Sequence, residues 1–201
     1  MTARIALLGD SIAWGQGASR ERDRLGPRLV DALDQHGIDA ELRTVAVPGA
    51  RSVALASQVD ATLLWSPSVC VIVIGANDLT HREPVVTAVR ALADAVRRLR
   101  AAGAEVVLAP APDLSAVPHV PAALRHAVRA AGDALRREQV AAAVAEGALV
   151  ADADQRASRA FAVDPSLFSA DRFHPSSAGY GVIADALLPA VLAATWVRTG
   201  S

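Results

Sequence analysis

Lysine is absent from this chain of 201 residues, and every one of its 20 basic side chains is an arginine. A Walker-type phosphate loop, a Schiff-base enzyme and a response-regulator receiver domain all need a lysine, so these three classes are excluded. An excess of charge is absent as well, because the net charge at pH 7 is −1. This balance argues against the binding of a nucleic-acid backbone as a main function.

Cysteine and aromatic residues are scarce. Cys70 is the only cysteine, so no disulfide can form within the chain, and its place in the apolar run Val69–Ile74 predicts an unreactive buried thiol. Aromatic residues make up 3% of the chain, whereas hydrophobic residues make up 52%, so aliphatic side chains must form the core. The length suits one α/β domain over residues 1–201, since no break in composition divides it.

Signals for export or for a membrane are also lacking. The segment Met1–Arg4 leads directly into an apolar strand, without the charged and apolar regions of a signal peptide. The apolar carboxyl-terminal helix is interrupted by Asp185 and Pro189, so no stretch of roughly 18 residues predicts a membrane span. We therefore expect a soluble, cytoplasmic protein, either a monomer or a small homo-oligomer.

Apolar runs alternate with segments of helical spacing along the whole chain. The runs predict five strands, at 5–9, 40–47, 69–74, 105–109 and 148–151. The segments with helical spacing are 25–33, 53–63, 84–102, 121–146 and 177–195, whereas residues 152–170 are less periodic. Strands that alternate with helices over short connections indicate a parallel sheet covered by helices on both faces.

Polar groups follow three of these strands. Ser11, Gly49 and Asn77 come just after the first, second and third strands. A doubly wound sheet brings the carboxyl ends of its strands to one rim, which is where such folds bind ligands. Asp171 and His174, just before the last helix, can reach the same rim. Taken alone, Gly9–Ser11 is also compatible with an ordinary turn and a helix-capping serine.

Together these five residues make a complete site for acyl transfer. A serine hydroxyl is a poor nucleophile until a base such as histidine takes its proton. The histidine needs a carboxylate on its other nitrogen, and Asp171 is close enough in sequence to His174 to supply it. The N–H groups of Ser11 and Gly49 and the amide of Asn77 can donate hydrogen bonds to the oxyanion of the tetrahedral intermediate.

Four blocks of this chain resemble the SGNH (GDSL) hydrolases. They are Gly9–Ser11, a glycine after the second strand, Gly75–Asp78 and Asp171–His174, in the family's order and with its approximate spacing. The resemblance covers nearly the whole chain. It implies a flavodoxin-like three-layer α/β/α fold with a five-stranded parallel sheet.

The resemblance also implies roles for single residues. Ser11 is the expected nucleophile, His174 the base and Asp171 its orienting partner, while Ser11, Gly49 and Asn77 form the oxyanion hole. The family often carries an asparagine or serine a few residues before the glycine of the second block, whereas this chain has Thr44–Gly49 there. Gly75 and Ala50 are therefore alternatives to Gly49.

Other residues near these blocks have two interpretations each. Trp14 either forms a wall of the acyl site or packs against the first helix, and His81 either borders the pocket or is a solvated surface histidine. Phe161, Leu167 and Phe168 either bind the acyl chain or alcohol of the substrate or form a small separate core. Asp10 and Asp78 are expected to support loops through hydrogen bonds to the backbone.

The sequence thus predicts a serine esterase that hydrolyses small or medium acyl esters through a covalent acyl-enzyme. Such an esterase needs no cofactor, and the histidines of this chain lack the spacing of metal ligands. An acyltransferase, a thioesterase, a lysophospholipase or a carbohydrate O-deacetylase would use the same site. A non-catalytic module that binds a nucleotide or a sugar is the alternative from another class, although no G-x-G-x-x-G motif follows a strand. The G-x-S-x-G motif of ordinary α/β-hydrolases is missing around Ser11.

Overall fold

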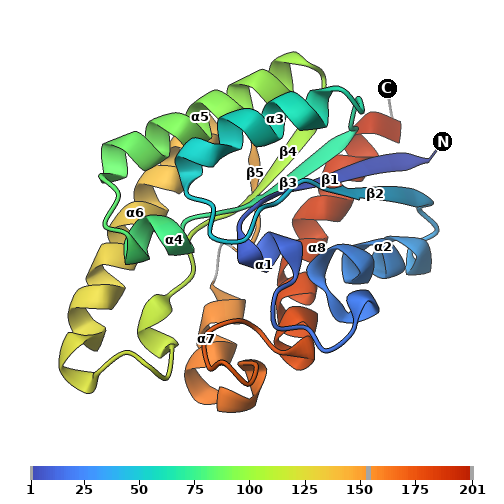
Figure 1. Ribbon diagram of the computed structural model, residues 1–201. Coiled ribbons are helices and arrows are strands. Elements are labelled where there is room, and N and C mark those ends of the chain that lie inside the picture. Colours follow the sequence, from blue (N-terminus) through green and yellow to red (C-terminus); the bar gives the residue numbers. More distant parts are fainter. Residues whose placement is uncertain (1, 153–154, 200–201) are drawn as a thin grey trace.

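The computed structural model describes residues 2–152 and 155–199 of the chain. Its centre is a five-stranded sheet in the order β2-β1-β3-β4-β5, in which every strand pair is parallel (Figure 1). The strands are β1 (Ala3–Gly9), β2 (Ala40–Thr44), β3 (Val69–Val73), β4 (Glu105–Ala109) and β5 (Leu149–Val150). All five predicted strands are therefore confirmed, in a parallel sheet.

Helices connect the strands and cover both faces of the sheet. The α-helices are α1 (Ser11–Trp14), α2 (Leu25–Gln35), α3 (Leu55–Leu63), α4 (Ala76–Thr80), α5 (Val85–Ala101), α6 (Arg125–Ala145), α7 (Arg156–Val163) and α8 (Ser177–Thr199). Short 3₁₀ turns are η1 (Glu21–Asp23), η2 (Ser52–Ala54), η3 (Leu114–Ala116), η4 (Ala122–Leu124) and η5 (Pro165–Leu167).

Alternate residues of the strands divide the core into two halves. Ile5 and Leu7 of β1 pack in one buried cluster with residues of α2 and α8, such as Leu29 and Val191. Ala6 and Leu8 point to the opposite face. There they pack with residues of α3, α5 and α6, among them Val59, Leu92 and Ala143. This arrangement confirms the predicted three-layer α/β/α fold (Figure 1).

The central strands are buried from end to end. All five residues of β3 are buried, and Cys70 in this strand is fully buried. Burial raises the pKa of the Cys70 thiol to about 12, so the thiol stays protonated at neutral pH. The prediction of an unreactive buried cysteine is consistent with this environment.

The structure differs from the sequence prediction mainly in the short elements. α1, α4 and α7 were not predicted as helices, since four, five and eight residues are too few to show a full apolar stripe. The segment predicted as one helix over 121–146 begins with the turn η4 and continues as α6. The regular strand β2 ends at Thr44 rather than at Val47, although the N–H groups of Val45 and Val47 still donate to the Leu7 and Gly9 carbonyls of β1.

The last helix, α8, confirms the helix predicted over 177–195 and contains Pro189. Asp185 and Pro189 do not break up its apolar stretch, contrary to the expectation from the sequence. The segment Ser177–Trp196 of α8 is long and apolar enough, by length and composition alone, to cross a membrane, with a mean hydropathy of 1.5. One side of this helix belongs to the core, where Tyr180, Leu187 and Val191 are buried against the sheet. The helix therefore serves as a core helix of this fold.

Candidate active site

Ser11 lies where β1 turns into α1, at the carboxyl end of the sheet. Gly9, the last residue of β1, has φ +131°, and a Cβ there would lie 1.8 Å from the carbonyl oxygen of Val73. The neighbouring strand therefore permits only glycine at this position. Asp10 caps α1, because its carboxylate accepts a hydrogen bond from the Ile12 N–H at 2.9 Å. Ser11 is the first residue of the helix, with 6% of its surface exposed.

Two buried side chains hold this turn in place. The Gln58 amide of α3 accepts a hydrogen bond from the Gly9 N–H at 2.7 Å and donates one to the Gly9 carbonyl at 2.9 Å. The hydroxyl of Tyr180, which is fully buried on α8, donates to the carbonyl of Gln16 at 2.7 Å. Ser11 is thus held between a helix on each face of the sheet.

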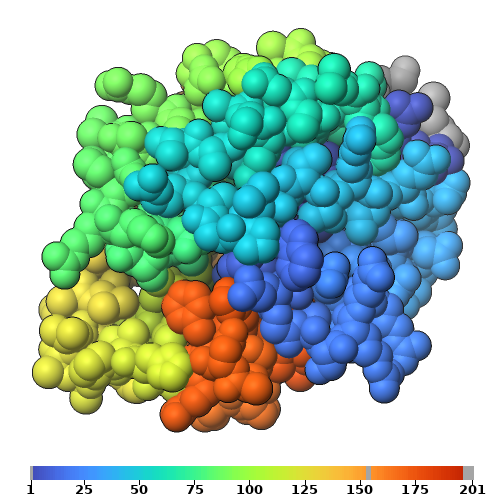
Figure 2. Space-filling view, in the orientation of Figure 1, coloured from blue at the N-terminus to red at the C-terminus, as the bar shows by residue number. Residues whose placement is uncertain are grey.

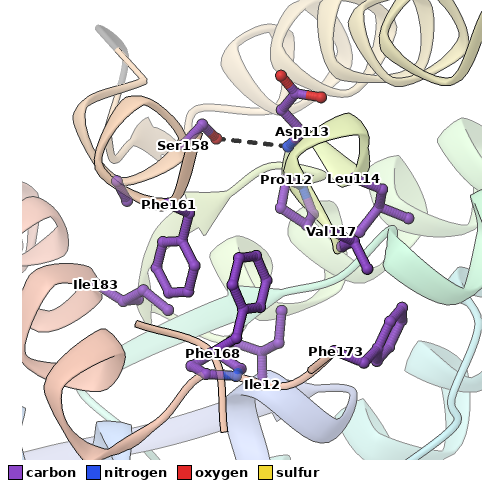
Figure 3. Close-up of a pocket in the computed structure, with 12 residues that line it drawn as sticks. Ile12, Pro112, Asp113, Leu114, Val117, Ser158, Phe161, Phe168, Phe173 and Ile183 are labelled. Atoms are coloured by element: carbon purple, nitrogen blue, oxygen red, sulfur yellow. Dashed lines mark hydrogen bonds between the residues drawn. The ribbon is translucent and has the colours of Figure 1, made fainter. Parts of the chain in front are cut away.

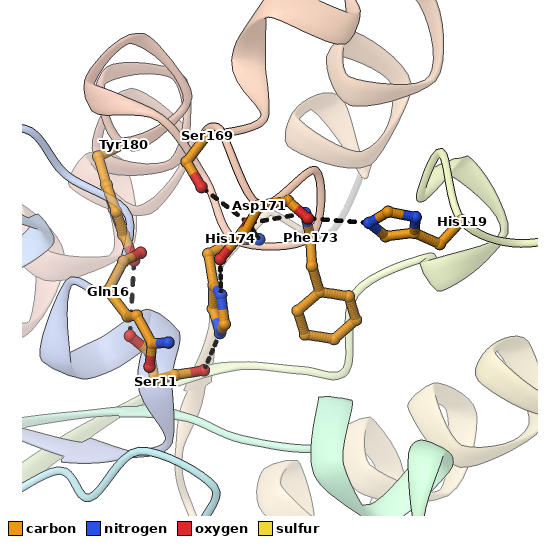
Figure 4. A network of polar contacts seen from close by, with 8 residues as sticks. All are labelled: Ser11, Gln16, His119, Ser169, Asp171, Phe173, His174 and Tyr180. Atoms are coloured by element: carbon orange, nitrogen blue, oxygen red, sulfur yellow. Dashed lines mark hydrogen bonds and ion pairs between the residues drawn. The ribbon is translucent and has the colours of Figure 1, made fainter.

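A chain of hydrogen bonds joins Ser11 to the loop before α8 (Figure 4). The Nε2 atom of His174 lies 3.1 Å from the Ser11 Oγ, and its Nδ1 atom lies 2.6 Å from the Asp171 Oδ2. Because a carboxylate only accepts hydrogen bonds, we assign the imidazole proton to Nδ1. The lone pair of Nε2 then faces the serine hydroxyl, as a general base requires.

Asp171 accepts four hydrogen bonds. Besides the His174 ring, the N–H groups of Phe173 and His174 and the hydroxyl of Ser169 donate to it, each within 3 Å. Partial burial acts to raise the pKa of Asp171, but the hydrogen bonds from His174, Phe173 and Ser169 outweigh it and hold the pKa well below its usual value. Asp171 is therefore ionised across the neutral range, which suits a group that orients and stabilises an imidazolium.

Gly49 and Asn77 lie on the two sides of Ser11. The chain after β2 continues beside β1, where the Val47 N–H donates to the Gly9 carbonyl at 3.1 Å, and Gly49 follows with φ +80°. Asn77 lies in the first turn of α4, which directly follows β3 on the other side of β1. Among the described residues, none hydrogen-bonds the Gly49 N–H or the side-chain amide of Asn77. Both groups are thus available as donors at this rim of the sheet.

Asp78 links the Gly49 loop to α4. Its buried carboxylate accepts hydrogen bonds from the Ser52 N–H at 3.0 Å and from the Ser52 hydroxyl at 2.7 Å. Ser52 begins η2, three residues after Gly49. The contact fixes the spacing between the two predicted oxyanion donors, in line with the expected supporting role of Asp78.

Asp10 is buried beside Ser11 and accepts fewer hydrogen bonds than Asp171 does. Its Oδ1 accepts from Ile12, whereas its buried Oδ2 has no hydrogen-bond partner among the described residues. Burial is the largest influence on the pKa of Asp10 and, together with the charge of Asp78, raises it to about 7, against the opposing effect of the Ile12 hydrogen bond.

The residues predicted to bind substrate form two groups, one at the ends of the short helices α1 and α4 and one at an apolar cavity. Trp14 is 37% exposed at the end of α1, where the Arg24 guanidinium lies 4.2 Å from its ring centroid. His81 ends α4, and its Nδ1 atom lies 2.9 Å from the Asn77 carbonyl. Phe161 and Phe168 contact each other edge to face at 5.0 Å and line an apolar cavity, whereas Leu167 is buried behind them.

Two apolar cavities lie next to this hydrogen-bond chain. The first, called here the α7 cavity, has a volume of about 80 Å³ and is lined by Ile12, Phe161, Phe168 and Ile183, among others (Figure 3). The second, called here the α4 cavity, has a volume of about 180 Å³, and its lining includes Leu79, Thr80, Val120 and Val128. In the space-filling view the surface is hollowed where α1, α4, the segment after β4 and the loop before α8 meet (Figure 2).

Several residues of this region were not identified from the sequence. Leu114, Val117 and Phe173 line both cavities. The Nε2 atom of the exposed His119 lies 2.8 Å from the carbonyl of Asp171 (Figure 4). These residues lie in loops without apolar periodicity. Only the position of Phe173 directly before His174 could have signalled its place.

Within residues 2–152 and 155–199, no three histidine, cysteine or acidic side chains come together as a group that could hold a metal ion. The polar groups around Ser11 are instead a hydroxyl, an imidazole, a carboxylate and amide donors. Such a set can carry out nucleophilic acyl transfer without a metal ion.

Solved structures of several esterases share this fold. The structure is similar to that of TesA, with a TM-score of 0.80 and 20% identity over 95% of this chain and 99% of the other. It is also similar to the psychrotrophic esterase EstA from Pseudoalteromonas sp., solved in a form inhibited by monoethylphosphonate, with a TM-score of 0.73 and 20% identity over 97% and 98% of the two chains. The acetylxylan esterase Axe2 from Geobacillus stearothermophilus matches with a TM-score of 0.73 and 18% identity over 94% of each chain. At these identities the likeness shows the fold alone.

Sequence comparison places the chain in a family. It is 37% identical over 191 residues to a GDSL-like esterase of Mycobacterium tuberculosis; the match covers 93% of this chain and 61% of that relative. The family model of the GDSL-like lipases and acylhydrolases matches residues 7–182, a range that contains all five predicted site residues. The chain therefore belongs to the GDSL-like lipase/acylhydrolase family.

Proposed function

We propose that this protein is a carboxylic ester hydrolase that cleaves small or medium acyl esters through a covalent intermediate on Ser11. The observation that carries the proposal is the chain of hydrogen bonds from Ser11 through His174 to Asp171, with distances of 3.1 and 2.6 Å. Membership of the acylhydrolase family supports the same reaction class.

In the first half of the reaction, the Ser11 Oγ attacks the ester carbonyl while its proton passes to the Nε2 of His174. The imidazolium that forms is stabilised by the carboxylate of Asp171, whose lowered pKa keeps it charged. The carbonyl oxygen becomes an oxyanion, and we assign the N–H groups of Ser11 and Gly49 and the Asn77 amide as its donors. Each such donor is typically worth about a hundredfold to a thousandfold in rate.

Collapse of the tetrahedral intermediate breaks the bond to the alcohol oxygen, which takes the proton from the His174 Nε2. The acyl group stays on Ser11. In the second half, His174 takes a proton from a water molecule, the hydroxide adds to the acyl carbon, and the Ser11 Oγ leaves with the proton. The products are one carboxylic acid and one alcohol, and the enzyme returns to its starting state.

Apolar surface beside the serine favours an acyl substituent of some length. Phe173, next to His174 in sequence, lines both the α7 cavity and the α4 cavity, so apolar surface begins directly beside the proposed base. The size of the α4 cavity, about 180 Å³, suits a short or medium alkyl chain.

Hydrolysis of p-nitrophenyl acetate and butyrate tests the proposal. Ser11→Ala should abolish turnover above the background rate while thermal stability changes by no more than about 1 kcal/mol, because one hydroxyl is lost. Ser57→Ala is the matched control, since Ser57 is an exposed serine of α3 that hydrogen-bonds only to the Ala54 carbonyl. Turnover by the Ser11 variant close to that of the unsubstituted enzyme would contradict the assignment.

A further inference from the structure

Phe173 separates two apolar cavities. The α7 cavity and the α4 cavity share three lining residues, which are Leu114, Val117 and Phe173. Leu114 and Val117 come from the segment after β4, and Phe173 comes from the loop before α8, so the common wall is built from two distant parts of the chain. Figure 3 shows the Phe173 ring to one side of the α7 cavity, near Leu114 and Val117.

The α4 cavity lies on the side of the site where α4 carries Asn77. Leu79 and Thr80, which line it, follow Asn77 by two and three residues on the same short helix. Its other wall includes the Phe173 ring, whose centroid lies 5.0 Å from that of the His174 ring in an edge-to-face contact. An ester carbonyl held between Ser11 and Asn77 therefore has this cavity beside it.

The α7 cavity lies on the other side of the shared wall, and its lining also includes Ile12 and Pro175, which follow Ser11 and His174 in the chain. It is lined by Phe161 of α7, Ile183 of α8 and Phe168, and its surface is almost entirely apolar. Its volume of about 80 Å³ is several times the roughly 10–15 Å³ that a single water-sized probe occupies. Burial of an alkyl chain in such an apolar cavity is favourable, whereas a water molecule there finds few hydrogen-bonding partners.

The two sides of the shared wall differ in how they are held. Leu114 begins η3, which the Asp113 carboxylate caps by accepting from the Ser115 N–H, and Arg129 of α6 pairs with Asp113 at 3.2 Å. Phe173 contributes its backbone N–H to the loop, through the hydrogen bond to the Asp171 Oδ1. Its side chain makes no hydrogen bond. Substitution of the Phe173 side chain therefore changes the wall while it keeps the backbone contacts that orient Asp171 and His174.

We propose that Phe173 determines the acyl-chain length that this enzyme accepts, by closing the α4 cavity, which holds the chain, against the α7 cavity on the other side of the ring. The inference rests on the proposed ester hydrolysis and adds the substrate class. The preferred substrates are esters of unbranched acyl chains short enough to end at the Phe173 ring. Removal of the ring joins the two cavities and admits longer chains.

The test is the ratio of kcat/KM for p-nitrophenyl decanoate to that for the butyrate, measured below the concentrations at which these esters form micelles. Phe173→Ala should raise this ratio by about tenfold or more, since a few methylenes gain an apolar pocket. Phe173→Leu should shift the ratio in the same direction by less, and it covers the case in which the alanine variant does not fold. Val86→Ala, on the exposed side of α5, is the matched control and should leave the ratio unchanged.

Phe161→Ala distinguishes the effect of a larger α7 cavity from the effect of opening the shared wall. Phe161 lines only the α7 cavity, so this substitution alone should leave the ratio unchanged, whereas combined with Phe173→Ala it should raise the ratio further. If Ser11-dependent hydrolysis persists but neither Phe173 variant raises the ratio, or both esters slow equally, the chain-length role is wrong and the esterase proposal stands. If no ester is hydrolysed in a Ser11-dependent way, the esterase proposal itself fails.

Discussion

Two aspartates lie near Ser11, and their environments are opposite. Asp171 is 45% exposed at its side chain, and hydrogen bonds from His174, Phe173 and Ser169 lower its pKa even though partial burial acts to raise it. Asp10 is 1% exposed and accepts a single hydrogen bond, and burial raises its pKa to about 7. The carboxylate that has water and donors stays charged, whereas the one that is enclosed binds a proton near neutral pH.

This difference in pKa indicates which of the two aspartates can stabilise an imidazolium and which supports the turn before α1. A group that stabilises an imidazolium must be ionised whenever the imidazole works as a base, and Asp171 meets this condition. Asp10 is next to Ser11 in sequence, yet its hydrogen bond goes to the backbone of α1 rather than to the imidazole. Its place beside the proposed nucleophile is therefore structural.

Substitution of Asp171 should reduce activity more than substitution of Asp10. Asp171→Asn removes the charge and presents an amide N–H donor to the Nδ1 of His174, which favours the tautomer with its proton on Nε2. The kcat should therefore fall about 10³- to 10⁴-fold, as for the equivalent change in serine proteases. Ester hydrolysis under saturating substrate measures the change. Asp31→Asn, on the exposed side of α2, is the control and should stay within about twofold. A loss of less than tenfold for Asp171→Asn would show that the carboxylate is not part of the catalytic chain.

Substitution of Asp10 should change how stability depends on pH. The pKa of Asp10 is raised from 3.8 to about 7 in the folded protein, so between these values the folded state binds a proton that the unfolded chain has lost. Stability therefore falls as pH rises from about 4 to 7 and is level above that. Asp171 acts oppositely: its lowered pKa adds stability that is present above its ordinary value of 3.8 and is lost as pH falls further.

Urea unfolding at pH 5 and pH 8 measures this prediction. The unsubstituted protein should lose on the order of 2 to 3 kcal/mol relative to Asp10→Asn over this interval, because each unit of pKa shift corresponds to about 1.4 kcal/mol. Asparagine keeps an oxygen that can accept from the Ile12 N–H and does not titrate, so the variant should show a flatter profile. Equal slopes for the two proteins would contradict the raised pKa.

The sequence was sufficient for the central strands β1, β3 and β4, because each is a largely apolar run that ends at glycine or proline. Val69–Val73 has no polar residue and is buried throughout, so burial on both faces left a plain pattern. The four polar blocks were also identifiable, since each directly follows or precedes a regular element. Single-domain organisation and a cytoplasmic location stay predictions.

The lining of the cavities could not be read from the sequence in the same way. Leu114, Val117 and Phe173 come from irregular loops, whose side chains follow neither the period of a strand nor that of a helix. They meet only because the turn after β4 and the loop before α8 lie at the same rim. Such contacts depend on tertiary packing between residues about 60 positions apart, which no local pattern encodes.

The most direct measurement of the central claim is the intact mass of the protein after reaction with a fluorophosphonate. Such a reagent labels a serine only where a neighbouring base activates it. We predict one adduct on the unsubstituted protein and none on Ser11→Ala, with the adduct retained on Ser57→Ala. An unlabelled unsubstituted protein, or an adduct that persists in Ser11→Ala, would contradict an activated Ser11.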